Sequence, residues 1–176
     1  YGPAEFKPSM GATATGARQI LIAYNVNLNT SDKKKANSIA GTIRTSGVIQ
    51  RDKNGDKLLS DDGKSIRKPG MFQHLQAAGW MYDQDTAQVS MNLLNHNVTG
   101  LHTVTDAILT EARKIGLEAI AGELVGLVPL SAMISAGKHY HDDPDSADSS
   151  TLVQSAINGL MLSELGEFDA YNSIIE

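Results

Sequence analysis

Five residues with metal-binding side chains lie close together in the C-terminal third of the chain: His139, His141, Asp142, Asp143 and Asp145. Imidazole and carboxylate groups are common ligands of zinc and other transition metals. The two histidines stand two positions apart at an expected helix end, whereas two ligands on one helical face stand three or four positions apart. This spacing favours an acidic, solvated helix terminus, and we expect no metal site.

Residues for covalent catalysis or nucleotide binding do not form a familiar motif. The sequence contains no cysteine, no Gly-x-x-x-x-Gly-Lys, no Gly-x-Gly-x-x-Gly and no Gly-x-Ser-x-Gly. His102 stands at the expected start of a helix, where the helix dipole lowers the pKa of an imidazole and favours its neutral form. A lone histidine in this position is more typical of a structural role, so we assign no catalytic residue.

Polar and apolar side chains alternate on two expected strands. The polar set is Asn25, Asn27, Gln88, Ser90 and Asn92. Because successive strand residues point to opposite faces, this set shares one face, whereas Val89, Met91 and Leu93 point the other way. An unpaired buried amide costs roughly 1–3 kcal/mol, so we expect the polar face to lie opposite the helices with Ile39, Ile108 and Ile157. In an isolated chain this face should be accessible to solvent or covered by a second copy. The face is simply hydrated, or it is a ligand groove that orients a polar heterocycle, or it meets a second subdomain.

Hydrophobic periodicity predicts the elements that position this face. Strands are expected near residues 18–28, 75–82, 87–94 and 118–127. Helices are expected from a cap at Thr30 or Ser31 to about 45, from 102 to 114, from Pro129 to 138, and after a cap at Ser149 or Ser150. Residues 46–72 are rich in turn dipeptides, which predicts a mobile excursion or small hairpin. The order predicts an α+β fold: a ferredoxin-like βαββαβ sheet with helices on one face and extra C-terminal helices.

Charge is distributed unevenly along the chain. The net charge is −5, but residues 1–68 hold twelve Lys and Arg against six acidic residues, whereas residues 69–176 hold three against fourteen. A basic segment attracts anions such as phosphate, nucleic acid or a carboxylate-rich small molecule, and charge alone does not choose among them. Since no apolar run approaches the roughly 18 residues of a membrane-spanning helix, we expect no membrane partner. We also expect no nucleic-acid partner. The opening residues Tyr1-Gly2-Pro3 are typical of the middle of a chain, so we expect a fragment.

Blocks of residues over nearly the whole chain resemble glutamate formiminotransferase and occur in the family's order. They are Gly2-Pro3 through Pro8-Ser9, Gly11 to Arg18, Leu21 to Leu28, Ala87 to Leu94, Leu101 to Val104, and Leu124 to Pro129. The closing stretch from Phe168 to Glu176 resembles the end of the formiminotransferase module, just before the cyclodeaminase part of the bifunctional animal enzymes.

The resemblance implies transfer of a formimino group from N-formimino-L-glutamate to tetrahydrofolate, a co-substrate, in histidine degradation. The reaction would take place in a tunnel between two α/β subdomains, in a cytoplasmic homo-oligomer without a metal. The family's general base is a histidine of the N-terminal subdomain, and no position here matches its motif. The chain would then be the C-terminal subdomain, residues 18–176, preceded by a folate-binding linker at residues 1–17. We expect this chain alone to have no formiminotransferase activity.

The family's folate-binding segment maps onto ten consecutive positions: Gly2, Pro3, Ala4, Glu5, Phe6, Lys7, Pro8, Ser9, Met10 and Gly11. Its glycines allow close backbone approach, Phe6 can contact an aromatic plane, and Lys7 can meet a carboxylate of the folate glutamyl tail. The chain departs from the family pattern at Met10, where animal members carry an aromatic residue, and at Glu123, where some carry glutamine. Residues 51–72 are longer than the usual connection.

Two other functions are compatible with the sequence. One is a separately encoded, non-catalytic folate-binding or regulatory subunit. The other is a small anion-binding module unrelated to folate. A companion N-terminal subdomain, encoded in the same gene or a neighbouring one, would distinguish the enzyme from the regulatory subunit.

Overall fold

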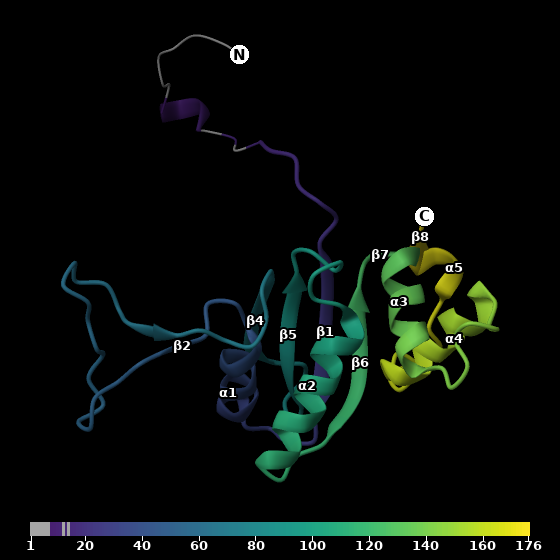
Figure 1. The fold of residues 1–176 in the computed structure, drawn as a ribbon. Helices are drawn as coiled ribbons and strands as arrows, with labels where there is room; N and C mark the ends of the chain where they lie inside the picture. Colours follow the sequence, from purple (N-terminus) through teal and green to yellow (C-terminus); the bar gives the residue numbers. More distant parts are fainter. Residues whose placement is uncertain (1–7, 12, 14) are drawn as a thin grey trace.

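The structure is a computed structural model that describes residues 8–11, 13 and 15–176. Figure 1 shows a sheet with two helices across one side and a helical unit beside the sheet. The elements follow in this order: η1 (Pro8–Met10), β1 (Ile22–Leu28), α1 (Lys33–Ile43), β2 (Val48–Ile49), β3 (Arg67–Lys68), β4 (Leu75–Met81), β5 (Ala87–Leu93), α2 (Leu101–Lys114), β6 (Ala119–Val125), β7 (Val128–Pro129), α3 (Leu130–Tyr140), α4 (Ser149–Gly159), α5 (Ala170–Ser173) and β8 (Ile174–Ile175).

The main sheet has four strands in the order β4-β5-β1-β6, and all its pairings are antiparallel. The first and third long strands of the chain, β1 and β5, are central, while β4 and β6 lie at the edges. This order and the helices α1 and α2 that connect the strands confirm the ferredoxin-like βαββαβ arrangement. Each central strand has hydrogen-bonded neighbours on both sides, so the side chains of β1 and β5 are the most enclosed.

The core lies between the sheet and the helices. The apolar stripe expected on α1 is buried, with Ala36, Ala40 and Ile43 fully covered and Ile39 nearly so. On α2, Val104, Ile108 and Ala112 are fully buried. Burying a large aliphatic side chain stabilises a fold by about 1.5–3 kcal/mol, so these two helix faces hold the sheet from one side.

The helix starts differ from the sequence prediction by one or a few residues. The N-cap of α1 is Asp32 rather than Thr30 or Ser31, and its carboxylate accepts from the backbone N–H of Lys34 at 2.9 Å. Asp148 caps α4 in the same way, ahead of the expected serines, by accepting from the N–H of Thr151 at 2.8 Å. The hydrogen bonds that Asp148 accepts from Thr151 lower the pKa of its carboxyl group. Aspartate and serine are about equally good N-caps, so the folded geometry decides which side chain reaches the backbone.

The C-terminal helices form a unit of their own beside β6. Gly137 of α3 lies against α4, where an added Cβ atom would come within 2.0 Å of the carbonyl oxygen of Leu152. Ile157 on α4 is buried in this unit, next to α3, rather than over the sheet as expected. The unit joins the sheet through the residues that follow α4, since the N–H of Gly122 on β6 donates to the carbonyl of Met161 at 2.9 Å.

Residues 46–72 form two short hairpins that branch from the β2–β3 stem, projecting away from α1 and β4 in Figure 1. Three backbone hydrogen bonds of 2.8–3.0 Å close the branch point. The N–H of Gln50 donates to the carbonyl of Ile66, that of Ile66 to Leu58, and that of Leu58 to Gln50. Gly55 and Gly63 occupy equivalent turn positions with φ of +89° and +77°. The sequence prediction of an excursion or hairpin is therefore confirmed in outline, but the branching was not foreseen.

Candidate functional site: the polar face of the sheet

The polar residues of β1 and β5 lie on the side of the sheet opposite α1 and α2. The Tyr24 hydroxyl shares a 3.0 Å hydrogen bond with that of Thr105 on α2, so Tyr24 faces the helices and Asn25 faces away. Gly79 of β4 lies beside Val89 and backs onto α1, because an added Cβ atom would be 2.4 Å from the Asn37 nitrogen. Val89 therefore also faces the helices. The predicted orientation of the polar face is confirmed.

The polar face is more buried than the sequence suggested. Asn25 and Asn27 pair with Ser90 and Gln88 across the β1–β5 ladder. The exposed fractions are 7% for Asn25, 1% for Asn27 and 5% for Gln88, although no helix covers them. The expectation of free solvent access was therefore wrong for these three amides, whereas Ser90 and Asn92 are half-buried.

The amide side chains of this face are only partly hydrogen-bonded. The Asn25 amide donates to the Glu123 carboxylate at 2.9 Å. The side-chain oxygens of Asn27 and Gln88 are buried and have no hydrogen-bond partner in the described part of the chain. Within β1, β4, β5 and β6, all fully described, Glu123 is the only charged residue. The face therefore offers amide groups, one carboxylate and the Ser90 hydroxyl to a polar neighbour.

Trp80 provides an aromatic surface at the edge of the same face. It pairs with Gln88 across the β4–β5 ladder, and its side chain is 59% exposed. The ammonium of Lys33 lies 4.8 Å from the centre of the indole ring, in a cation–π contact. Such a contact contributes roughly 0.5–1 kcal/mol at an exposed site. The indole is thereby held at the rim of the amide-rich surface.

The predicted folate-binding segment lies only partly in the described structure. Gly2, Pro3, Ala4, Glu5, Phe6 and Lys7 lie outside the described residues. Pro8 and Ser9 are exposed in the short helix η1, and Gly11 follows with φ of +66°. Figure 1 shows the described part leading away from the sheet at the end where β1 begins. The described part of the segment, residues 8–11, thus does not lie on the polar face.

A cleft of about 870 Å³ lies at the same end of the sheet, where β4 begins and β5 ends. Its walls include Arg44, Phe72, His74 and Gln76. The guanidinium of Arg44 donates to the carbonyls of Gly47 at 2.9 Å and Ala77 at 3.2 Å. These bonds hold the Arg44 guanidinium in the wall of a cleft that is lined by both apolar and polar residues. The cleft lies at the end of the sheet where β1 begins, and the residues that precede β1 include the predicted folate-binding segment.

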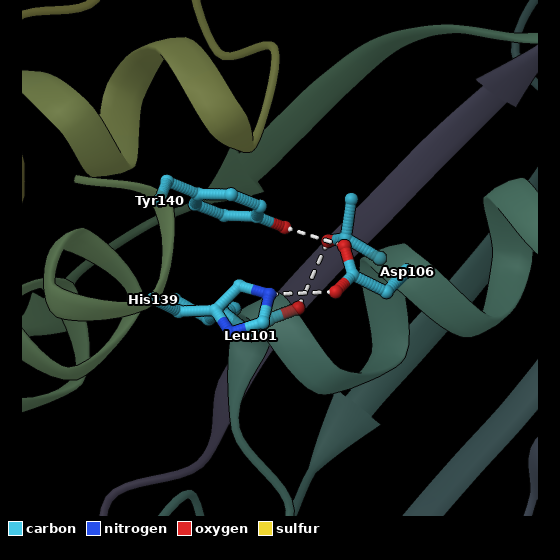
Figure 2. Close-up of polar contacts among 5 residues, drawn as sticks. Leu101, Asp106, His139 and Tyr140 are labelled. Atoms are coloured by element: carbon cyan, nitrogen blue, oxygen red, sulfur yellow. Dashed lines mark hydrogen bonds and ion pairs between the residues drawn. The ribbon is translucent and has the colours of Figure 1, made fainter. Parts of the chain in front are cut away.

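A second polar cluster joins α2 to α3 on the helical side of the sheet (Figure 2). Asp106 accepts from the Tyr140 hydroxyl at 3.1 Å, and its other oxygen lies 2.7 Å from Nε2 of His139. His102 stacks on His139 with ring centres 4.7 Å apart. Sequence analysis singled out His102, His139 and His141, and the structure brings His102 and His139 together. Sequence reasoning missed Asp106 and Tyr140, because their spacing carries no recognisable signal.

The polar cluster of α2 and α3 connects the two helices and plays a structural role. Burial raises the pKa of Tyr140, and the neighbouring Asp106 carboxylate raises it further, so the phenol stays protonated. Burial is also the main reason that the pKa of His102 is lowered, with a smaller effect from His139. The direction expected for His102 is thus confirmed, although burial supplies the cause. Since the cluster faces away from the amides, we do not assign it to the site.

The acidic helix end holds local contacts. The backbone N–H of Asp143 donates to the ring of His141 at 3.0 Å. Among residues 8–11, 13 and 15–176, no three His, Asp or Glu side chains converge as metal ligands would. In the same described residues, no helix combines the length and apolar character that crossing a bilayer requires.

Comparisons with known proteins match this chain to one family. The family model described as "Formiminotransferase domain" matches residues 23–176. Formimidoyltransferase-cyclodeaminase of Dictyostelium discoideum is 39% identical over 179 residues, and that of Rattus norvegicus is 37% identical, each covering 100% of this chain. Glutamate formimidoyltransferase of Streptococcus pyogenes serotype M1 is 35% identical over 141 residues, or 80% of this chain.

The matches cover a minor part of each relative. This chain spans 30% of the two formimidoyltransferase-cyclodeaminases and 40% of the streptococcal glutamate formimidoyltransferase. Apart from Ile22, the family match nevertheless includes all four strands of the main sheet, and it includes every helix from α1 to α5. The chain belongs to the formiminotransferase domain family.

Proposed function

We propose that this chain is the folate-binding C-terminal half of a glutamate formiminotransferase that acts in histidine degradation. Residues 1–17 form its folate-binding linker and residues 18–176 its C-terminal subdomain. The observation that carries the proposal is the family match over residues 23–176, because one of the matched relatives is named a glutamate formimidoyltransferase. The chain meets an N-terminal subdomain that contributes the catalytic base, in a cytoplasmic homo-oligomer.

The proposed reaction moves a one-carbon unit between two nitrogen atoms. N5 of tetrahydrofolate attacks the formimino carbon of N-formimino-L-glutamate, and a new carbon–nitrogen bond forms. The bond between that carbon and the glutamate nitrogen then breaks. The proton lost from N5 balances the one gained by the departing amine, so the products are 5-formiminotetrahydrofolate and glutamate. A base must accept the first proton, and we assign that step to the N-terminal subdomain.

The role of this chain is to bind and orient. The pteridine ring of tetrahydrofolate and the formimino group both carry N–H donors, and the orphaned acceptors of Asn27 and Gln88 fit such donors. Close, fixed placement of two reactants can supply several kcal/mol of a barrier, and a rigid antiparallel sheet is suited to this placement. A non-catalytic folate-binding or regulatory subunit is the alternative, and it would bind folate without turnover in any pairing.

The folate-binding segment is tested by neutralising its cation. In an enzyme that contains this chain and its N-terminal half, Lys7→Ala is expected to weaken tetrahydrofolate binding. One charged hydrogen bond to a glutamyl carboxylate is worth about 1.5–3 kcal/mol, or roughly 10- to 150-fold in affinity. Raising the ionic strength should reduce the parent's affinity as well. Isothermal titration calorimetry measures both effects.

Lys64→Ala is the matched control for Lys7→Ala. Lys64 lies on the projecting hairpins, where its ammonium already contacts Asp62 at 2.5 Å and remains largely exposed. Its neutralisation should leave folate affinity unchanged. Equal affinities of the Lys7→Ala variant and the parent would remove Lys7 from the site, and a loss with Lys64→Ala alone would move the tail-binding cations to the hairpins.

A further inference from the structure

An arm formed by residues 48–68, from β2 to β3, carries exposed apolar side chains. None of its residues is buried, and Leu59 is 58% exposed, Ile66 38% and Leu58 37%. Leu58 and Ile66 lie together at the branch point, where the N–H of Ile66 donates to the carbonyl of Leu58. Aliphatic side chains that gather on a projecting element without being buried are typical of a contact surface.

Hydrogen bonds to the backbone hold the arm in a defined shape. Besides the three bonds at its branch point, the guanidinium of Arg51 donates to the carbonyl of Gly55 at 2.7 Å. Antiparallel bridges pair Arg51 with Lys57 and Leu59 with Ser65. Since side chains two positions apart in extended backbone share a side, Lys57 and Leu59 point the same way. An element that is preorganised in this manner loses little conformational freedom when it binds a partner.

The two ends of the sheet carry opposite charge. Residues 33–68, which include α1 and the arm, hold ten Lys and Arg against four Asp. Residues 141–176, most of the C-terminal helical unit, hold eight Asp and Glu and no Lys or Arg. Figure 1 shows the first segment at the β4 edge of the sheet and the second beyond the β6 edge. Surfaces of opposite charge steer their encounter and favour one register over others.

A groove of about 710 Å³ lies on the acidic helical unit. Its walls include the aliphatic side chains of Leu130 on α3 and of Val153 and Ile157 on α4. Gln154, an exposed residue of α4, also lines it. The groove therefore has room and an apolar surface for an aliphatic side chain.

Two aspartates add negative charge next to the groove. Asp148 caps α4 and Asp169 caps α5, and the residues that follow them, Ser149 and Ala170, line the groove. Hydrogen bonds accepted from their own helices lower the pKa of both carboxyl groups, so both are ionised at neutral pH. The groove thus combines an apolar wall with negative charge near its rim.

We propose that the arm docks in this groove on a second copy of the chain. Leu59 then enters the aliphatic part of the groove, and the ammonium of Lys57 lies next to the two aspartates. This inference rests on the homo-oligomer of the proposed function and assigns the surfaces through which the copies meet.

A second copy is the occupant that the charges and the topology favour. Arm and groove lie at opposite ends of the sheet, so one chain cannot join its own pair. Two copies can form the same contact twice around a two-fold axis, which closes the dimer and satisfies both ends at once. The N-terminal half has its proposed place on the amide-bearing face, which leaves the arm and the groove to another partner.

Charge reversal at two exposed positions tests the contact in an enzyme that contains both halves. Lys57→Glu should weaken self-association, because a glutamate would face the two aspartates. Gln154→Arg should weaken it by placing a cation where Lys57 docks. We expect each single variant to raise the dissociation constant of the dimer about tenfold or more. The double variant should associate more tightly than either single variant, since the two new charges attract each other. Sedimentation velocity over a concentration series measures these constants.

Leu59→Ser tests the apolar part of the contact. It should also weaken the dimer about tenfold or more, because the leucine side chain leaves water on docking. Val98→Ser is the matched control, since Val98 is 55% exposed and lies outside the arm and the groove. Lys114→Glu is the control for charge reversal, at the end of α2. Both controls should leave the dissociation constant unchanged, and all variants should keep the parent's melting temperature.

A disulfide between copies tests the pairing directly. The chain has no cysteine, so Leu59→Cys and Gln154→Cys each introduce a single thiol into it. When the two variants are mixed under mild oxidation, a disulfide should link residue 59 of one copy to residue 154 of the other. Mass spectrometry of the linked peptides identifies it. Leu59→Cys mixed with Thr110→Cys, on the exposed surface of α2, should not give the corresponding link.

The outcomes that contradict the docking differ from a failure of the proposed function. If the enzyme is active while parent and variants share one dissociation constant and no 59–154 link forms, the docking is wrong and the proposed activity stands. A link from residue 59 to the N-terminal half would make that half the occupant and would also overturn the inference. If the single variants weaken the dimer and the double variant does not recover, the two residues do not meet. A parent that stays monomeric contradicts both the docking and the proposed homo-oligomer, whereas folate binding and turnover are measured independently.

Discussion

The isolated chain is expected to show no formiminotransferase turnover. The transferred group must be attacked by a folate nitrogen that loses its proton, and a positioned base typically contributes about 10²- to 10⁴-fold to such a step. The polar face of the sheet offers amides and one carboxylate, and we propose that the base belongs to the N-terminal subdomain. The measurement is the rate at which the chain converts N-formimino-L-glutamate and tetrahydrofolate into 5-formiminotetrahydrofolate, which is detected by chromatography.

Addition of the N-terminal half in trans is expected to restore turnover. Each half contributes one wall of the proposed tunnel, so the reaction should depend on the concentration of the partner until the halves are saturated. The control is the same N-terminal half alone, which should also be inactive. Turnover by purified residues 1–176 alone would contradict the division of roles. Halves that demonstrably associate but do not react would favour the regulatory-subunit alternative.

Gly122→Val is expected to destabilise the chain strongly. A Cβ atom at this position would come within 2.0 Å of the carbonyl oxygen of Leu160 and 3.0 Å of the Tyr24 hydroxyl. The carbonyl belongs to the backbone and already accepts a bond from Tyr24 at 3.1 Å, so it cannot move cheaply. Overpacking of this kind costs about 3 kcal/mol at the upper end of its usual range. Urea unfolding with a tryptophan signal from Trp80 measures the loss.

Gly16→Val provides the control for Gly122→Val. Gly16 precedes β1 in an exposed stretch, and nothing lies within 4 Å of the Cβ atom that a substitution would add. Its replacement should change the free energy of unfolding little. If Gly122→Val were as stable as Gly16→Val, the C-terminal helical unit would not be docked on β6 as described. Because β6 also carries Glu123 on its other face, the same variant should weaken ligand binding.

The architecture of the sheet could be predicted from the sequence because it follows from local patterns. Alternation in residues 22–28 and 87–93 specified both the strands and the face that each side chain occupies. The helix caps could not be chosen correctly, since Thr30, Ser31 and Asp32 all have capping side chains and only the folded geometry decides which one reaches the backbone. The predicted domain division at residue 17 stays a prediction.

The parts of the site that escaped prediction depend on contacts between distant residues. The Tyr24 hydroxyl reaches Thr105 and Leu160, 81 and 136 positions away, and no period in the sequence encodes such a meeting. The 1% exposure of Asn27 could not be predicted either, because alternation along a strand gives the face of a side chain but not how deeply it is buried. The branched hairpins are an intermediate case, because Gly55 and Gly63 recur eight positions apart in similar turns, a repeat that the sequence did contain.

The central claim is that the amide-bearing face of the sheet, rather than its helical side, meets the N-terminal half and the substrates. The chain has no cysteine, so single thiols can be placed on either side. Ser90→Cys lies on the amide face and Thr110→Cys on the exposed surface of α2. The rate of thiol alkylation, followed on this chain by mass spectrometry, should fall for Ser90→Cys when the N-terminal half and folate are added, and stay constant for Thr110→Cys. Protection of Thr110→Cys with unchanged labelling of Ser90→Cys would contradict the account.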